Sequence, residues 1–111
     1  MGLLTGKQAA GRALAAGDIR NTPPAWLPGF TADVGADPEW LSRVEALRAV
    51  LTSGGRTLAQ GALAWIWARS PRTVPIPGFR TVAQAEENAG AIAKGPLDAA
   101  QLAEVDRILG R

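Results

Sequence analysis

The chain has 111 residues, which is enough for one small domain around one compact core. Its 12 basic and 10 acidic residues nearly balance, so the charge does not favour a nucleic-acid-binding function. The absence of Cys, His and Tyr excludes disulfides and thiol chemistry and removes the commonest general base and metal ligand.

The pattern of apolar residues does not indicate a membrane protein. No apolar run reaches the roughly 20 residues that a membrane-spanning helix needs. The first residues, MGLLTGKQAAG, lack the apolar core of a signal peptide. We therefore expect a cytoplasmic location, with no membrane and no nucleic acid among the partners.

Residues 1–37 form a loop-rich segment. Prolines and glycines punctuate residues 21–38, which predicts an extended loop. Three large apolar residues lie inside it, and we expect them to pin the loop onto a core: Trp26, Leu27 and Phe30.

Residues 38–111 form the helical part. Apolar residues at helical spacing predict four helices, at Pro38 to about Ser53, Thr57 to about Arg69, about Val82 to Ile92, and Asp98 to about Leu109. Each has a residue that can cap its first turn. Asp37 precedes the first helix, and Thr57–Gln60, Thr81–Gln84 and Asp98–Gln101 have the spacing of capping boxes.

Two further features lie around the second helix. In its residues LAQGALAWIWA, apolar side chains occupy almost every face of the helix, which predicts a helix covered on more than one side. Trp65 and Trp67 point roughly 200° apart on such a helix, so they cannot face the same partner. After it, Thr73–Pro77 is a candidate strand of the doubly buried kind, although Pro75 restricts it to an edge or an irregular strand.

The start of the third helix gathers polar residues that suit an anion. The N-terminus of a helix presents free N–H groups and the positive end of the helix dipole. Gly78 allows close approach of the backbone, and Arg80 adds a forked cation that matches a phosphate. Gln84, Glu87 and Asn88 follow on one face, as amide, carboxylate and amide. The alternative is an ordinary solvated helix face with a common capping device.

The stretch VPIPGFRTVAQAEENAGAI, residues 74–92, resembles the C-terminal cofactor-binding signature of the aldo/keto reductases. The resemblance extends over the chain apart from about residues 8–37. GLLTGK is similar to the segment after the seventh barrel strand, TVPIPG to the eighth strand, TVAQAEENAGAI to the eighth helix and LDAAQLAEVDRIL to the C-terminal helix. The resemblance implies an α/β fold, the C-terminal portion of a TIM barrel, helix-rich as an isolated chain, with one or two short strands.

The resemblance also implies a function, namely NADP(H)-dependent reduction of carbonyls and oxidation of alcohols. It assigns Gly78 and Arg80 to the 2′-phosphate of the adenosine, and Gln84, Glu87 and Asn88 to its adenine and ribose. The implied cofactor-binding set is completed by Phe79 and Thr81 of the same motif and by Lys7, which with Gly6 lies along the pyrophosphate and nicotinamide side. Arg20 is a candidate for the Arg of the loop that folds over the cofactor.

The catalytic residues that the resemblance implies are Asp, Tyr, Lys and His from the first half of the barrel. The chain has no Tyr and no His, so we expect no catalytic residue in it, no metal site, and an inactive isolated chain. We expect a fragment that begins at an internal or artificial Met and that oligomerises or docks with a missing N-terminal barrel portion. The alternatives are a small helical interaction module without cofactor and an enzyme completed by another chain.

Overall fold

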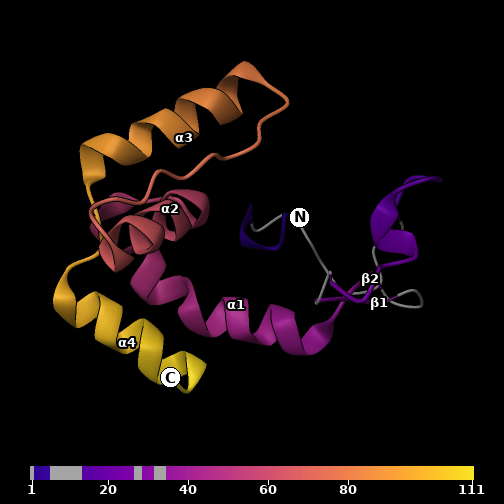
Figure 1. Cartoon of the computed structure of the whole chain (residues 1–111), viewed down its shortest axis with the longest axis horizontal. Coiled ribbons are helices and arrows are strands. Elements are labelled where there is room, and N and C mark those ends of the chain that lie inside the picture. The colour runs from indigo at the N-terminus through magenta and orange to yellow at the C-terminus, as the bar shows by residue number, and fades with distance from the viewer. Residues whose placement is uncertain (1, 6–13, 27–28, 32–34) are drawn as a thin grey trace. The chain divides into compact units, whose positions relative to one another are not determined.

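The structure, a computed structural model, describes residues 2–5, 14–26, 29–31 and 35–111 (Figure 1). The chain divides into two compact units, Met1–Ala46 and Leu47–Arg111, and the division falls within a helix. The described residues contain four α-helices, and none of these is both long enough and apolar enough to cross a membrane. No barrel is formed by the described residues, and their only strands are a pair of two-residue segments.

The first unit has a small core around a short antiparallel pair. Strand β1 (Phe30–Thr31) pairs with β2 (Gly35–Ala36), with Phe30 opposite Ala36. Phe30 and Ala36 are buried, and Leu3 and Leu41 pack against them. The expectation that Phe30 pins this segment is confirmed. It is wrong for Trp26, whose side chain is 69% exposed, and Leu27 lies outside the described residues.

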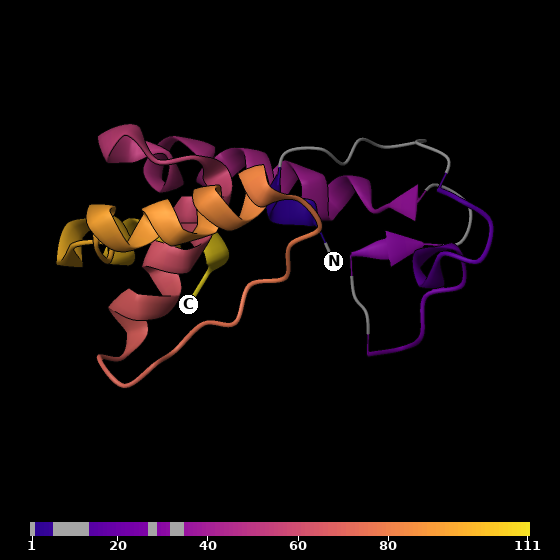
Figure 2. The same ribbon diagram turned by 90° about the horizontal axis from the view of Figure 1, so that it is seen from above.

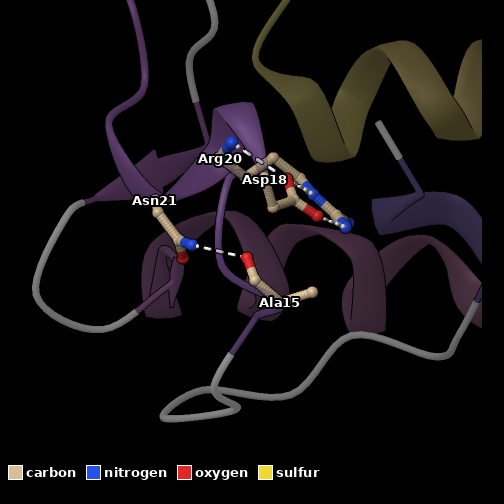
Figure 3. Close-up of polar contacts among 4 residues, drawn as sticks. All are labelled: Ala15, Asp18, Arg20 and Asn21. Carbon is tan, nitrogen blue, oxygen red and sulfur yellow. Dashed lines mark hydrogen bonds and ion pairs between the residues drawn. The ribbon is translucent and has the colours of Figure 1, made fainter.

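Two 3-10 helices, η1 (Leu3–Thr5) and η2 (Ile19–Asn21), also belong to this unit. Asp18 caps η2 by accepting from the backbone N–H of Arg20 at 3.0 Å. The same carboxylate holds the Arg20 guanidinium, with Nε to Oδ1 at 2.8 Å (Figure 3). Asn21 Nδ2 donates to the carbonyl of Ala15 at 2.9 Å, closing the turn (Figure 3). Because the hydrogen bond to Asp18 favours the charged form, it raises the pKa of Arg20 above its ordinary value.

Helix α1 (Pro38–Leu51) begins as the sequence predicts. Asp37 Oδ1 accepts from the backbone N–H of Glu39 at 2.8 Å, and Pro38 occupies the first helical position, where it has no donor to lose. The regular helix ends at Leu51, two residues before the predicted end at Ser53. A separate 3-10 turn, η3 (Ser53–Gly55), follows, with Gly54 at a positive φ of 67°.

The second unit is built around α2 (Leu58–Arg69), which packs against both α3 (Val82–Lys94) and α4 (Ala99–Leu109). Figure 1 shows α3 and α4 on opposite sides of α2. The prediction that α2 is covered on more than one side is therefore confirmed. The buried apolar residues of this unit come from the end of α1, from α2, α3 and α4, and from the connection before α4: Leu47, Leu51, Leu58, Leu63, Ala64, Ala91, Leu97 and Val105.

Trp65 and Trp67 have different surroundings, as their spacing predicts. Trp65 is flanked by the guanidinium groups of Arg69 and Arg111, whose Cζ atoms lie 5.6 and 5.9 Å from the ring centroid. Trp67 instead lines a groove beside α3. The ion pair from Arg69 to Asp106, at 3.1 Å, joins α2 to α4.

The predicted capping boxes hold at two helices and fail in part at the third. Thr57 with Gln60 and Asp98 with Gln101 make both hydrogen bonds of the box. The Thr81 hydroxyl accepts from the backbone N–H of Gln84, but the Gln84 side chain does not return to Thr81. Its Oε1 accepts from the backbone N–H of Arg80 at 2.7 Å, one residue earlier.

The predicted strand at Thr73–Pro77 is wrong. Residues 73–79 have no regular secondary structure and run as an extended trace between α2 and α3 (Figure 2). The physical reason is that a strand exists only with a neighbour to complete its hydrogen-bond ladder. The described residues supply no neighbour here, and Pro75 and Pro77 have no N–H to donate.

Candidate functional site

The amino end of α3 presents unpaired donors. Thr81 is the N-cap, with extended backbone, and its hydroxyl satisfies the N–H of Gln84. Within the described part of the chain, the N–H groups of Val82 and Ala83 have no acceptor. Two free donors and the positive end of the helix dipole therefore meet at this end.

The residues before the helix lie open to solvent. Gly78 and Arg80 are exposed, and the Phe79 side chain is 63% exposed. A Cβ built on Gly78 would meet nothing within 4 Å among the described residues, so close packing against them does not require glycine there. No ion pair or side-chain hydrogen bond to another described residue holds the Arg80 guanidinium, which leaves all five of its N–H donors available to a ligand.

Gln84 fixes the backbone from which Arg80 projects. Its Oε1 accepts the Arg80 backbone N–H, so the carbonyl half of the amide is engaged within the chain. The amide nitrogen of Gln84 makes no hydrogen bond to another described residue and keeps two donors. Gln84 therefore holds the backbone of Arg80 in place at the start of α3.

Glu87 and Asn88 lie one turn further along α3, and both are half-buried. The backbone carbonyl of Glu87 accepts from Gln60 Nε2 at 2.8 Å, across from α2. This bond fixes the distance between α2 and α3 at the level of the candidate site. Sequence reasoning assigned Gln60 only to its capping box, because nothing in the sequence pairs it with a carbonyl 27 residues away.

A groove of about 370 Å³ lies between α2, the connecting segment and α3. Apolar side chains dominate its lining, and Asn88 is the lining residue with a side-chain amide. Other lining residues are Leu63, Trp67, Pro75, Phe79 and Ile92. Phe79, before the first turn of α3, and Ala85, within α3, both line the groove.

The remaining expected contributors are Lys7, Gly6 and Arg20. Lys7 and Gly6 lie outside the described residues. Arg20 belongs to the first unit and is engaged by Asp18, so the structure gives it an intramolecular role. No cluster of three or more His, Cys, Asp or Glu side chains that could hold a metal ion occurs among the described residues.

Comparison with known proteins adds the following. The family model for the aldo/keto reductase family matches residues 1–110. The aldo-keto reductase str7 of Strobilurus tenacellus is 36% identical over 90 residues, which cover 81% of this chain and 25% of the relative. The chain thus spans about a quarter of the length of this curated relative. No solved structure gives a significant match. The match over residues 1–110 identifies the chain as a member of the aldo/keto reductase family.

Proposed function

We propose that this chain carries the adenosine-phosphate side of an NADP(H) site in an oxidoreductase that interconverts carbonyls and alcohols. The observation that carries the proposal is the open amino end of α3. There, two N–H groups without acceptors in the described chain lie beside an exposed guanidinium. Such a donor set fits a phosphate monoester, because backbone amides and a forked cation together match its oxygens.

We assign the roles as follows, and the position of each side chain supports the assignment. Arg80 binds the 2′-phosphate, and Gln84 positions it through the 2.7 Å bond to its backbone. Gly78 and Phe79, both exposed, form the approach to the phosphate. Thr81 keeps its hydroxyl on the helix and so leaves the next two N–H groups free for the ligand. These assignments correspond to the 2′-phosphate side of the cofactor.

The adenine and ribose are assigned to the next turn. Asn88 lines the groove with an amide that can pair with a base edge, and the Glu87 carboxylate can accept from a hydroxyl or an exocyclic amine. Lys7 is assigned to the nicotinamide side. When bound, NADP(H) supplies or accepts the hydride of the reaction.

The proton donor for the carbonyl is assigned to residues outside these 111, because the sequence contains no Tyr and no His. We place the chain in the C-terminal portion of a TIM barrel, with 74–79 as the eighth-strand segment and α3 as the eighth helix. The helix-rich second unit and the absence of a strand ladder at 73–77 are consistent with a portion that lacks its neighbouring strands.

Titration with NADPH and NADH, followed by calorimetry or tryptophan fluorescence, tests the proposal. We expect NADPH to bind more tightly than NADH and the preference to fall about 10- to 100-fold in Arg80→Ala, the value of one charge-assisted contact. Arg72→Ala is the matched control, since Arg72 is also exposed and lies in the same connection. It removes the same charge and should keep the preference.

Equal loss in both variants would reduce the effect to net charge and contradict the assignment of Arg80. An absence of binding at millimolar cofactor would favour the alternative of a helical interaction module. The exposed apolar side chains of the connection and of α3 are the observation that supports that alternative.

A further inference from the structure

One buried polar side chain lies between α2 and α3. Gln60, in the first turn of α2, is 7% exposed, and no other polar or charged residue in the described part of the chain is buried. Both halves of its amide are engaged. Oε1 accepts from the backbone N–H of Thr57 at 3.1 Å, and Nε2 donates to the carbonyl of Glu87 at 2.8 Å. A buried amide needs such partners, and here one partner belongs to each helix.

The bond to Glu87 determines where α3 lies along α2. Among the residues that the structure describes, no other hydrogen bond or ion pair joins these two helices. Small apolar side chains make up part of the remaining contact. Ala91 is 1% exposed, and Ala89 lines the groove together with Leu63 and Trp67 of α2. Apolar contacts have no direction, whereas a hydrogen bond weakens steeply when its donor and acceptor move out of line.

The bonded carbonyl belongs to the part of the candidate site that we assign to adenine and ribose. It lies in the rigid peptide plane that joins the Cα atoms of Glu87 and Asn88. Asn88 lines the groove from α3, and Leu63 and Trp67 line it from α2. Gln60 thus connects α2 directly to the peptide unit that carries the two proposed adenosine contacts, and it sets the width of the groove between them and α2.

The phosphate part of the site does not depend on this bond. The backbone of Arg80 is held by Gln84 of α3, at 2.7 Å, and the free N–H groups of Val82 and Ala83 belong to α3 itself. A shift of α3 against α2 therefore carries the guanidinium and these N–H groups along together, while the groove changes its width.

We propose that Gln60 is a positioning residue for the adenine end of the cofactor. Its amide holds α3 at the separation from α2 at which Asn88 and the apolar side chains of α2 contact the base together. Gln60 itself does not touch the ligand, because it is buried and both its amide atoms are engaged within the chain. The inference rests on the proposed function in taking the groove as the adenine site.

The test compares affinities for NADPH and NADH, measured by calorimetry on variants that circular dichroism shows to be folded. Gln60→Met keeps the length of the side chain but has no donor. We expect it to bind both cofactors about 10-fold more weakly, with an unchanged preference for NADPH, because both contain the same adenine. Arg80→Ala should instead weaken NADPH alone. Thr57→Ala is the matched control, since it loses the other bond of the same capping box and keeps the bond to Glu87; it should bind as the unmodified chain does.

Two further measurements separate positioning from a loss of stability. Without ligand, the side-chain amide resonances of Asn88 should shift in Gln60→Met and stay in place in Thr57→Ala. Gly90→Val reaches the same bond from α3, because a Cβ at Gly90 would already lie 3.2 Å from Gln60 Nε2. The larger side chain displaces the amide and leaves both residues of the capping box in the sequence. It should weaken both cofactors in the same way as Gln60→Met.

The outcomes distinguish this role from the proposed function. Equal affinities of Gln60→Met and Thr57→Ala, or Asn88 resonances that do not move in Gln60→Met, would overturn the positioning role and leave an Arg80-dependent preference for NADPH intact. Weaker binding of both cofactors by Gln60→Met, with no such preference in the unmodified chain, would reject the phosphate site alone. If the unmodified chain binds neither cofactor, both proposals are overturned.

Discussion

Gly61 lies in the interior of α2, where replacing glycine with alanine ordinarily stabilises a helix by about 1 kcal/mol. Here we predict the opposite. A Cβ at this position would lie 2.1 Å from the carbonyl oxygen of Leu51 and 2.8 Å from its Cβ. The oxygen belongs to the backbone at the end of α1, so the two segments have to separate by about 1 Å to restore ordinary contact.

Overpacking of this kind costs about 3 kcal/mol, the upper end of the usual range, because backbone must move. After the gain in helix propensity, Gly61→Ala should lower the free energy of unfolding by about 2 kcal/mol. That corresponds to a fall in Tm of roughly 8–16 °C for a domain near 100 residues. Urea and thermal unfolding, followed by far-UV circular dichroism, measure both quantities.

Gly90→Ala in α3 is the matched control. Among the described residues, the added Cβ would meet Gln60 Nε2, at 3.2 Å, and a side-chain end can yield by the few tenths of an ångström that are needed. Its Tm should lie at least about 8 °C above that of Gly61→Ala. If Gly61→Ala proves as stable as the unmodified chain, the close approach of α2 to Leu51 is refuted.

Three further predictions concern the second unit. Gln60→Ala should lower the free energy of unfolding by about 1–3 kcal/mol, because the hydrogen bond from α2 to the carbonyl of Glu87 and the capping bond from the backbone N–H of Thr57 are both lost; a loss below about 0.5 kcal/mol in urea unfolding would contradict these two contacts. Asp98→Ala should cost about 1 kcal/mol and Asp98→Asn much less, since asparagine also caps; equal losses in thermal unfolding would exclude the cap. The hydrogen bond from Arg107 lowers the pKa of Glu104 in the folded protein. The stabilisation that this hydrogen bond gives the folded state is therefore fully present above the ordinary carboxyl pKa of 4.5, and it is lost as the pH falls through the lower pKa of the folded state. Glu104→Gln should therefore lower Tm at neutral pH and leave it unchanged in strong acid, and a Tm difference that persists in acid would be the contrary result.

The helices could be predicted from the sequence because their signals are local. A cap and its partner are three residues apart, so Thr57 with Gln60 and Asp98 with Gln101 are legible without any tertiary information. The Gln84 side chain, which accepts from the backbone N–H of Arg80 rather than that of Thr81, shows the limit of such reasoning. Arg80 and Thr81 both offer a backbone N–H within reach of its side chain, and spacing alone does not decide between them.

Strands could not be predicted in the same way, because each depends on a neighbour. Thr73–Pro77 has strand-like residues but no partner strand among the residues that the structure describes, whereas Phe30 and Ala36 pair within a segment that the sequence predicts to be a loop. In the candidate site, too, one feature could be predicted from the sequence and another could not. The free end of α3 follows from its capping motif, while the bond from Gln60 to the Glu87 carbonyl depends on how α2 and α3 pack.

The proposed cofactor site depends on phosphate recognition by the open end of α3, and nuclear magnetic resonance with adenosine 2′-phosphate tests this most directly. This ligand carries the proposed recognition group without the nicotinamide half of the cofactor. We predict that the amide resonances of Val82 and Ala83 shift on its addition, that adenosine alone does not shift them, and that the shift weakens at high salt and in Arg80→Ala. Unmoved resonances at millimolar ligand, or an equal response to adenosine, would contradict the account.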